Sequence, residues 1–265
     1  MILSLNVVAA VLYFFATLGH CLYLIFSDRR MGRLAVGLFL VGALLHTGLL
    51  VAQVLQNPYP FFLSDGDFFY CAAWASAVAY FLALRKYRMI GLSTVFSLVV
   101  LVLFILAEIR KRHFYLGAGA SENPWALIHI LFMSLAFAVF SASFLIGLVY
   151  LLQQSQLKGR HPGALLSRLP SLEATDAMHY RALTVGFVLL SIGILAGAAL
   201  SKTTEGRFFR GDSKQVMALV TWALYALFLN VRLKAGWRGR RGIILSILGF
   251  AGVVLAFLTL EHRVM

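Results

Sequence analysis

Long apolar runs alternate with short polar turns along the whole chain. Each run is close to the ~20 residues that an α-helix needs to cross a bilayer. Backbone groups inside lipid must pair within their own segment, so each run is expected to be a helix. Eight runs can be marked: Leu3–Phe26, Leu34–Gln53, Phe68–Leu84, Met89–Leu106, Trp125–Leu152, Leu183–Leu200, Val216–Val231 and Gly242–Leu260. The pattern predicts an all-α, polytopic integral membrane protein with eight transmembrane helices.

The basic residues between these runs predict an orientation. The turns around residues 29–33, 85–88, 158–181 and 232–241 hold 15 of the 23 Lys and Arg residues. The remaining 8 lie on the other side, in 110–112, 202–214 and at Arg263. Because basic turns tend to stay in the cytoplasm, the first set is predicted to be cytoplasmic. Both termini then lie outside, on the periplasmic face of a bacterial inner membrane.

Composition agrees with this assignment. The 265 residues are 61% hydrophobic, with a mean hydropathy of +0.88, which is more apolar than a soluble domain. The net charge of +13 lies in the short turns, so the expected partner is the lipid bilayer and not nucleic acid. Cys21 and Cys71 lie in or beside apolar runs, and no CxxCH motif for covalent haem is present. We expect a single membrane domain over 1–265, with four helices in 1–108 and four in 124–262.

Two connections and one glycine pair add detail. The outer loop 107–124 closes with Glu122-Asn123-Pro124, a helix-start signal. Residues 153–180 are predicted to be the longest cytoplasmic connection, and their composition is compatible with a short amphipathic helix on the membrane surface. Gly193 and Gly197 form a small-xxx-small pair, which is expected to pack closely against a neighbouring helix.

Two of the seven histidines are predicted to lie near one polar loop. His129 lies one turn into the fifth run and His262 follows the eighth, so both are expected at the outer end. The loop over 201–215 enters and leaves the membrane on the same side. Two imidazoles beside an aromatic loop suit non-covalent, b-type haem, because histidine is a common axial ligand of haem iron. The alternative is a packing histidine in a helix and a solvated histidine in the tail.

The loop supplies five further candidate residues. Phe208 and Phe209 are placed to cover a porphyrin face by apolar contact, and Arg207 and Arg210 to pair with its propionates. Asp212 is expected to orient the loop by capping the start of the seventh helix.

Three other histidines are interpreted differently. His20 and His46 lie deeper in the first two runs, where hydrogen bonding to neighbouring helices is favoured over a second ligand site. His179 is expected at the cytoplasmic interface. No nucleophile–base–acid set, phosphate loop or HExxH motif is present, so a stand-alone catalyst is not expected.

Short motifs follow one another in the second half of the chain. They are Trp125–His129 at the start of a long helix, Gly206, Asp212 and Lys214 in the loop, Thr221, Trp222 and Tyr225 in the next helix, and Gly236–Arg241 after it. In this order they resemble the cytochrome c assembly membrane protein family, which includes CcsA and HemX. Its members carry an outer loop W-G-x-x-W-x-W-D-P-K-E, then T-W-x-x-Y and G-W-R-G-R-R. The similarity is clearest over 124–258.

The sequence also departs from this family. Glu205, Phe209 and Gly211 replace the three tryptophans of the loop, so the loop 201–215 is degenerate. Asn230 stands where haem-exporting members carry a membrane-embedded histidine. The resemblance is therefore closest to the HemX-like, eight-helix members.

The resemblance implies a role in haem handling. We expect an inner-membrane accessory or haem-delivery protein that assists c-type cytochrome assembly or haem biosynthesis, with cytochrome c assembly subunits or a haem-biosynthetic enzyme as partners. The proposed ligands are His129 and His262. The alternative is a cofactor-free membrane regulator or scaffold that controls a haem-biosynthetic enzyme.

Overall fold

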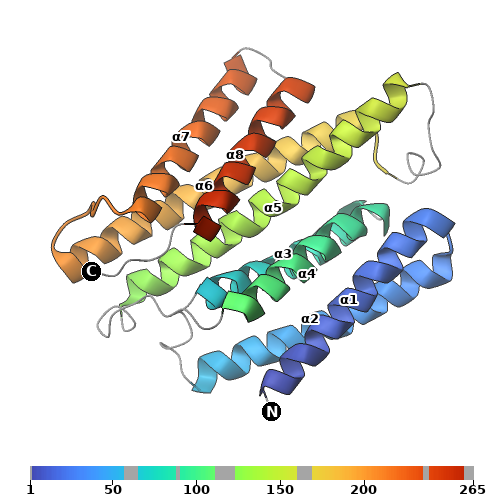
Figure 1. Ribbon diagram of the computed structural model, residues 1–265, viewed down its shortest axis with the longest axis horizontal. Coiled ribbons are helices and arrows are strands. Elements are labelled where there is room, and N and C mark those ends of the chain that lie inside the picture. Colours follow the sequence, from blue (N-terminus) through green and yellow to red (C-terminus); the bar gives the residue numbers. More distant parts are fainter. Residues whose placement is uncertain are drawn as a thin grey trace. The chain divides into compact units, whose positions relative to one another are not determined.

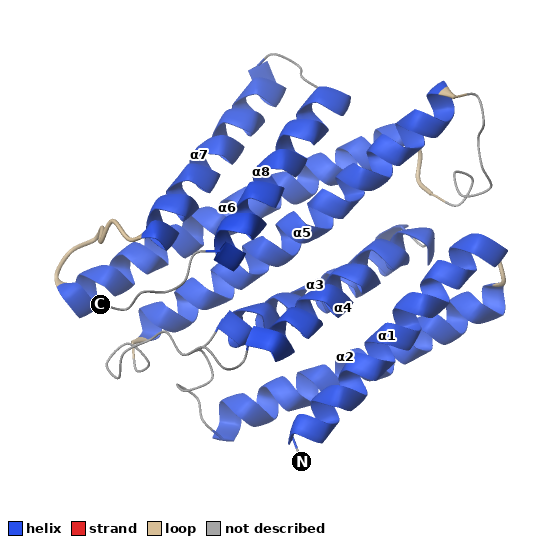
Figure 2. Ribbon diagram, in the orientation of Figure 1, coloured by secondary structure: helices blue, strands red, loops and turns tan. Residues whose placement is uncertain are grey.

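The computed structural model describes residues 2–56, 65–87, 90–110, 123–159, 169–234 and 239–259. All regular structure in these ranges is α-helix (Figures 1 and 2). The helices are α1 (Ile2–Phe26), α2 (Arg29–Gln56), α3 (Asp65–Tyr87), α4 (Ile90–Arg110), α5 (Pro124–Lys158), α6 (Leu172–Glu205), α7 (Ser213–Lys234) and α8 (Arg240–Thr259). The predicted all-α class is confirmed.

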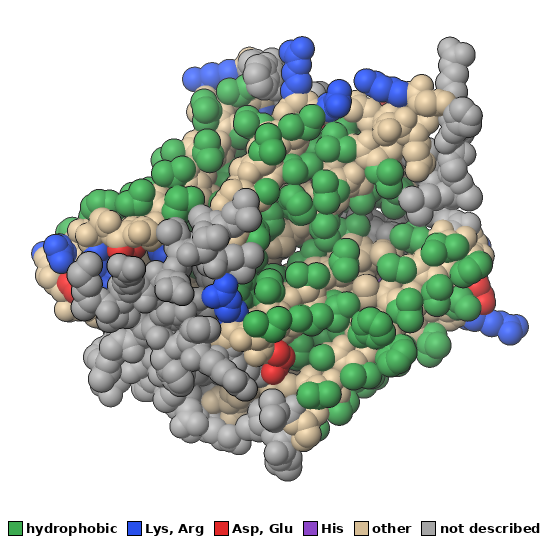
Figure 3. All heavy atoms as spheres, viewed as in Figure 1, with side chains coloured by type: hydrophobic (Ala, Val, Ile, Leu, Met, Phe, Trp, Pro, Cys, Tyr) green, Lys and Arg blue, Asp and Glu red, His purple; other side chains and the backbone are tan. Residues whose placement is uncertain are grey.

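Helices α1 to α7 are long and apolar enough to cross a membrane. Large apolar side chains point outward from them, such as Leu195 on α6, which is 70% exposed. Figure 3 shows hydrophobic side chains along the helix flanks, with Lys and Arg side chains toward the helix ends. A surface this apolar needs lipid around it, because soluble proteins expose only small apolar patches. The chain is therefore a multi-pass membrane protein, and a membrane crossing by α8 stays a prediction.

The helices divide into two compact units. Unit 1 comprises Met1–Phe114 and Gln156–Pro170 and contains α1 to α4. Unit 2 comprises Tyr115–Ser155 and Ser171–Met265 and contains most of α5 and all of α6 to α8.

Unit 1 begins with a tight hairpin of α1 and α2. Ser27 adopts a φ of 60° in the turn, and the Asp28 carboxylate accepts a 2.8 Å hydrogen bond from the Arg30 N–H at the start of α2. About two turns from this connection, α1 and α2 touch at Gly19. A Cβ on Gly19 would lie 2.9 Å from the Cβ of Ala35. A small residue at this crossing permits the close approach.

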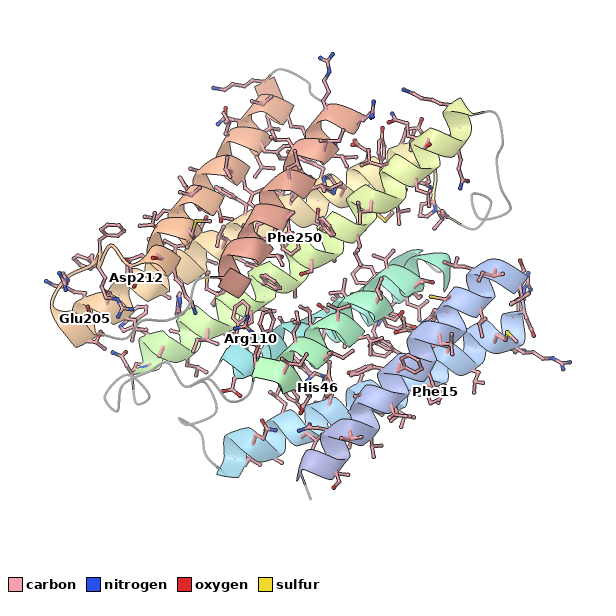
Figure 4. The ribbon with its side chains drawn as sticks, viewed as in Figure 1. Phe15, His46, Arg110, Glu205, Asp212 and Phe250 are labelled. Atoms are coloured by element: carbon pink, nitrogen blue, oxygen red, sulfur yellow. The ribbon has the colours of Figure 1, made fainter. Side chains whose placement is uncertain are left out.

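The core of unit 1 is aromatic and partly polar. Tyr13, His20, Phe39, His46 and Tyr80 are each at most 1% exposed. Polar side chains on membrane helices turn inward, because lipid offers them no hydrogen-bond partners. Figure 4 shows His46 among the helices of this unit. Both histidines hydrogen-bond to tyrosines of neighbouring helices, which confirms the favoured interpretation.

Unit 2 is built on the close packing of α5 and α6. A Cβ on Gly193 would lie 2.7 Å from the Met133 sulfur, and one on Gly186 would lie 2.7 Å from the Phe140 ring. Larger residues at these positions would force the helices apart. The expected close packing of the glycine face of α6 is confirmed.

The T-W-x-x-Y motif of α7 holds that helix in place. The Trp222 indole N–H donates a 2.9 Å hydrogen bond to the Ser191 hydroxyl on α6. The Tyr225 ring stacks on Phe140 of α5, with 4.3 Å between centroids and 8° between planes. The motif thus joins α7 to both long helices of unit 2.

Residues 153–180 are more helical than predicted. Helix α5 continues to Lys158 and α6 starts at Leu172, which leaves 159–171 as the connection. The Ser171 hydroxyl accepts a 3.2 Å hydrogen bond from the Ala174 N–H and caps α6. Residues 172–180 form the first turns of α6, and a short amphipathic helix within residues 160–168 would lie outside the described residues. His179, expected at the cytoplasmic interface, is fully buried between helices and hydrogen-bonded to Ser143 on α5 and Ser246 on α8.

A buried ion pair stabilises this extension of α6. Arg232 on α7 donates two hydrogen bonds to the Asp176 carboxylate, of 3.2 Å and 2.6 Å, and its guanidinium lies 4.4 Å from the Tyr180 ring centre. The same carboxylate accepts the Gly239 N–H at 3.2 Å, so it also fixes the start of α8. Gly239 has a φ of 75°, and a Cβ there would lie 2.8 Å from the Tyr150 hydroxyl. Glycine is required by both the conformation and the contact.

Candidate functional site

His129 is held in one orientation by α6. It lies one turn into α5, and its Nδ1 is 2.7 Å from the Gly193 carbonyl oxygen. A carbonyl oxygen only accepts hydrogen bonds, so Nδ1 carries the proton. In a neutral imidazole Nε2 then carries the lone pair. Histidines that bind metals commonly have this arrangement, with a backbone carbonyl fixing the ring from behind.

Gly197 gives the imidazole its space. A Cβ at this position would lie 2.7 Å from Nδ1 and 2.8 Å from Cε1 of His129. Real Cβ contacts are not this short, so any side chain at residue 197 would displace the ring. The pair recognised in the sequence therefore has two different tasks: Gly193 offers its carbonyl to the histidine and Gly197 makes room for it.

The start of α5 and the end of α6 lie together, and we call this part of the molecule the His129 end of unit 2. The Asn123 side chain caps α5 by accepting the Trp125 N–H at 3.0 Å. Its amide nitrogen donates a 2.6 Å hydrogen bond to the Thr203 hydroxyl on α6. The helix-start signal at Asn123-Pro124 is confirmed, and the same residue joins the two helices.

The loop between α6 and α7 leaves this same end and has a defined shape. Gly206 ends α6 in the left-handed conformation, with a φ of 77°, and its N–H donates to the Lys202 carbonyl. The Asp212 carboxylate accepts the Gln215 N–H at 2.7 Å at the start of α7, so the predicted cap is confirmed. Figure 4 labels Glu205 and Asp212 on either side of the loop.

Gln215 is a positioning residue that the sequence reading missed. Its side-chain oxygen accepts the Arg210 and Gly211 N–H groups at 2.7 Å and 3.3 Å, and its amide nitrogen donates to the Phe208 carbonyl at 3.2 Å. A Gln three residues after a capping Asp is a known helix-start pattern, which was the available signal. The side chain supports the loop backbone from inside.

The two arginines of the loop differ in their surroundings. Arg210 lies 2.6 Å from the Glu205 carboxylate and 3.3 Å from that of Asp212, so its charge is already compensated. Arg207 is 67% exposed and reaches Glu205 only at 3.9 Å. Arg207 is therefore the arginine that remains available to an added carboxylate, whereas Arg210 holds the loop together.

The aromatic residues of the loop are open to the surroundings. Phe208 is 61% exposed and Phe209 is 52% exposed. The Lys202 ammonium lies 5.4 Å from the centre of the Phe208 ring and donates to the Gly206 carbonyl at 2.8 Å. Phe208 and Phe209 therefore offer exposed apolar surface, and the basic group of Lys202 lies beside the Phe208 ring.

The structure brings His129 and the loop to one end of unit 2. His129 contacts α6 at Gly193, Asn123 joins the start of α5 to Thr203 near the end of α6, and the loop begins directly after α6. His262, the second predicted ligand, lies outside the described residues. Among the residues with described positions, no three His, Cys, Asp or Glu side chains converge as a metal site.

The residues present fit one side of a haem. An imidazole whose Nε2 is free of a proton, two exposed phenylalanines and a largely exposed arginine are the residue types that would meet the iron, the ring face and a propionate. No part of this set forms a nucleophile or a general-base pair. The arrangement suits binding and presentation of a planar, amphipathic, anionic ligand.

Comparison with known proteins agrees with the sequence motifs. Residues 66–263, most of the chain, match the family described as Cytochrome C assembly protein. The chain is similar to Protein HemX of Brevibacillus brevis, with 29% identity over 239 residues that cover 88% of this chain and 86% of that protein. It is also similar to the cytochrome c biogenesis protein CcsA of Synechococcus sp. strain JA-3-3Ab, with 27% identity and 70% coverage of each chain.

Other relatives are covered less completely. The match to CcsA of Mesostigma viride has 28% identity over 159 residues and covers 52% of each protein, so the chain spans about half of that relative's length. The family match includes α3 to α8, and thus all of the His129 end described above. With two thirds of its length and more inside this match, the chain belongs to the cytochrome c assembly protein family.

Proposed function

We propose that this protein binds b-type haem non-covalently at the His129 end of unit 2 and assists haem handling for c-type cytochrome assembly. The observation that carries the proposal is the 2.7 Å contact between His129 Nδ1 and the Gly193 carbonyl, which leaves Nε2 as a ligand atom. Membership of the family supports the choice of haem over other planar ligands. The similarity to CcsA, a cytochrome c biogenesis protein, is consistent with this role.

Each residue has a stated task in this proposal. His129 Nε2 binds the iron, and Phe208 and Phe209 cover one ring face. Arg207 pairs with a propionate through charge-assisted hydrogen bonds, a role for which Arg210 is less suited because of Glu205 and Asp212. When bound, haem supplies an iron centre that accepts axial imidazole and changes oxidation state. His262 is the proposed second ligand.

The proposal includes an orientation. We place all eight helices across a bacterial inner membrane in a single membrane domain, with both termini and the His129 end on the periplasmic side, because the larger basic share lies in the opposite turns. In a variant without Cys21 and Cys71, a membrane-impermeant thiol reagent should label Ser213→Cys in intact cells but not Arg240→Cys. Labelling of Arg240→Cys alone would reverse the orientation.

The protein is proposed to act with partners. The sequence contains no phosphate loop and no HExxH motif, and we assign the protein an accessory or delivery role. The expected partners are cytochrome c assembly subunits or a haem-biosynthetic enzyme. Haem held at a membrane end of a helical bundle is accessible to such a partner from the aqueous side.

A cofactor-free scaffold is the second candidate, because two observations favour it. Arg210 is compensated within the loop, and Asn230 is an exposed residue of α7 where haem-exporting members of the family carry a histidine. In this alternative the cytoplasmic connection 153–180 and the basic turn Arg232–Arg241 contact a haem-biosynthetic enzyme. Only the first candidate requires bound haem, so a binding measurement separates them.

The visible spectrum of the purified protein separates the two candidates. We expect protein in mild detergent to show a Soret band after extensive washing, or to develop one at close to equimolar haemin. The band should shift on reduction with dithionite, because axially ligated haem iron changes oxidation state. Protein that stays colourless during titration with haemin would favour the scaffold and contradict the haem proposal.

A further inference from the structure

The core of unit 1 contains phenols and imidazoles in an unusual combination. Tyr13, Tyr70 and Tyr80 are each at most 1% exposed, although each carries a hydroxyl group inside a membrane bundle. Polar groups at such positions are costly and commonly have a function. This cluster lies in unit 1 and does not depend on haem binding at the His129 end of unit 2.

Two of these phenols are paired with a base. The Tyr13 hydroxyl lies 3.1 Å from Nδ1 of His46, and the Tyr80 hydroxyl lies 3.2 Å from Nε2 of His20. Ser93 also hydrogen-bonds to the Tyr80 oxygen. In both pairs a neutral imidazole can accept the phenolic proton directly, since one of its ring nitrogens carries a lone pair.

The two pairs are connected by ring contacts. The Phe39 ring stacks on Tyr80 with centroids 4.0 Å apart, and its centroid is 5.2 Å from that of Tyr13. His20 lies 5.7 Å from Tyr80, and His46 lies 6.0 Å from Tyr13, again between ring centroids. An unbroken series of rings therefore runs through the inside of the bundle, from one tyrosine–histidine pair to the other.

Tyr70 and Tyr225 are also buried, in different surroundings. The Tyr70 ring lies 4.2 Å from the His46 ring between centroids, but its hydroxyl is bonded to an amide. The Tyr70 hydroxyl donates to the Asn6 amide oxygen at 3.2 Å, and an amide oxygen is a poor proton acceptor. The Tyr225 hydroxyl in unit 2 is buried and has no hydrogen-bond partner among the described residues. Helix packing in lipid requires that polar groups find partners, which an amide provides as well as an imidazole. It does not require that two phenols face imidazoles and both contact the Phe39 ring.

We propose that Tyr13 and Tyr80 form a redox relay inside unit 1. Each phenol gives one electron to a one-electron oxidant, such as an oxidised metal centre, while its hydroxyl proton moves to the paired imidazole. The products are a neutral phenoxyl radical, an imidazolium and the reduced oxidant, so charge and atoms balance. One electron and one proton returned to the pair restore the starting state.

Phe39 connects the two tyrosines of the relay. Because this ring touches both tyrosines, an oxidising equivalent at one of them passes to the other, with an electron moving in the opposite direction. Each radical stays neutral, since the proton remains on the adjacent histidine. The surrounding bundle excludes water, which would otherwise exchange with the transferred proton.

Electron paramagnetic resonance after flash oxidation tests the relay. The full-length protein in nanodiscs is illuminated with a lipophilic ruthenium(II) sensitiser and a sacrificial electron acceptor, then frozen. We expect a neutral tyrosyl radical whose long-lived fraction is mostly lost in the Tyr13→Phe/Tyr80→Phe double variant. Tyr225→Phe is the matched control, because this buried tyrosine lacks a base, and it should leave the signal unchanged.

A second pair of variants separates the relay from packing. In His20→Gln/His46→Gln both phenols keep an acceptor of similar size that is not a base, so the fold should be retained while the long-lived radical is lost. Circular dichroism and size-exclusion profiles check the fold. Absence of a tyrosyl radical in the wild-type protein, or its full retention in either double variant, would overturn the proposal.

Discussion

Replacing Asp176 with Ala is expected to lower the free energy of unfolding by about 3 kcal/mol. Arg232 is 8% exposed by side chain, so the substitution leaves a buried guanidinium without its carboxylate. The same change removes the acceptor for the Gly239 N–H at the start of α8. Equilibrium unfolding in mixed detergent micelles measures the loss.

Two comparisons define this effect. An apolar replacement of the whole pair, Asp176→Leu/Arg232→Met, should recover most of the lost stability, because no charge is then buried alone. Glu205→Gln, which removes an exposed partner of Arg210, should cost less than about 1 kcal/mol. A loss for Asp176→Ala as small as that of Glu205→Gln would show that the pair does not stabilise the α6–α7 contact.

The Asp176 pair also explains why the sequence placed the start of α6 too late. Residues 172–181 contain Glu, Asp, His and Arg, and hydropathy treats such residues as exposed. In the fold Asp176 meets Arg232, which is 56 positions away, and His179 meets Ser143 and Ser246. These partners are far away in the sequence, so a local hydropathy pattern does not include them. Polar helix turns that are buried by such long-range pairing are therefore predicted to be a loop.

The apolar helices could be predicted from the sequence because lipid imposes a simple rule on them. Every backbone group must be paired, so each long apolar run becomes a helix whatever it packs against. The glycine face of α6 was equally visible, since small residues at fixed spacing predict close contact. The spacing alone did not predict that the Gly193 carbonyl would bond to His129 or that Gly197 would leave room for its ring.

The sequence predicted the location of the candidate site better than the role of each residue in it. The topology implied by eight runs placed His129 and the loop at one end, and capping chemistry predicted the role of Asp212. The sequence treated Arg207 and Arg210 as equivalent. The fold distinguishes them, because Arg210 lies between two carboxylates and Arg207 does not. The pairing of each arginine with a carboxylate depends on the path of the loop backbone, which the sequence pattern does not give.

Replacing His129 with Ala has the largest expected effect on haem binding, because it removes the one ligand atom that the structure holds in place. We expect most of the bound haem to be lost, or its spectrum to change from six- to five-coordinate. Added imidazole should partly restore the original spectrum by filling the vacated position. His179→Ala is a suitable control for removing a buried histidine, since His179 is bonded elsewhere in unit 2.

Gly197→Ala tests the same site without removing the imidazole. The new Cβ would lie 2.7 Å from Nδ1 of His129, so the ring must move away from the Gly193 carbonyl and haem occupancy should fall. Gly186→Ala is the matched control on the same helix. Its Cβ would meet the Phe140 ring at the same distance of 2.7 Å, so it introduces comparable strain away from His129.

The central claim is that His129 binds haem iron through Nε2, and the absorption spectrum of purified His129→Ala with and without imidazole tests it most directly. We expect a weakened or five-coordinate spectrum that imidazole returns toward that of the wild type. An unchanged spectrum in His129→Ala, with wild-type haem content, would contradict the assignment of His129 as an axial ligand.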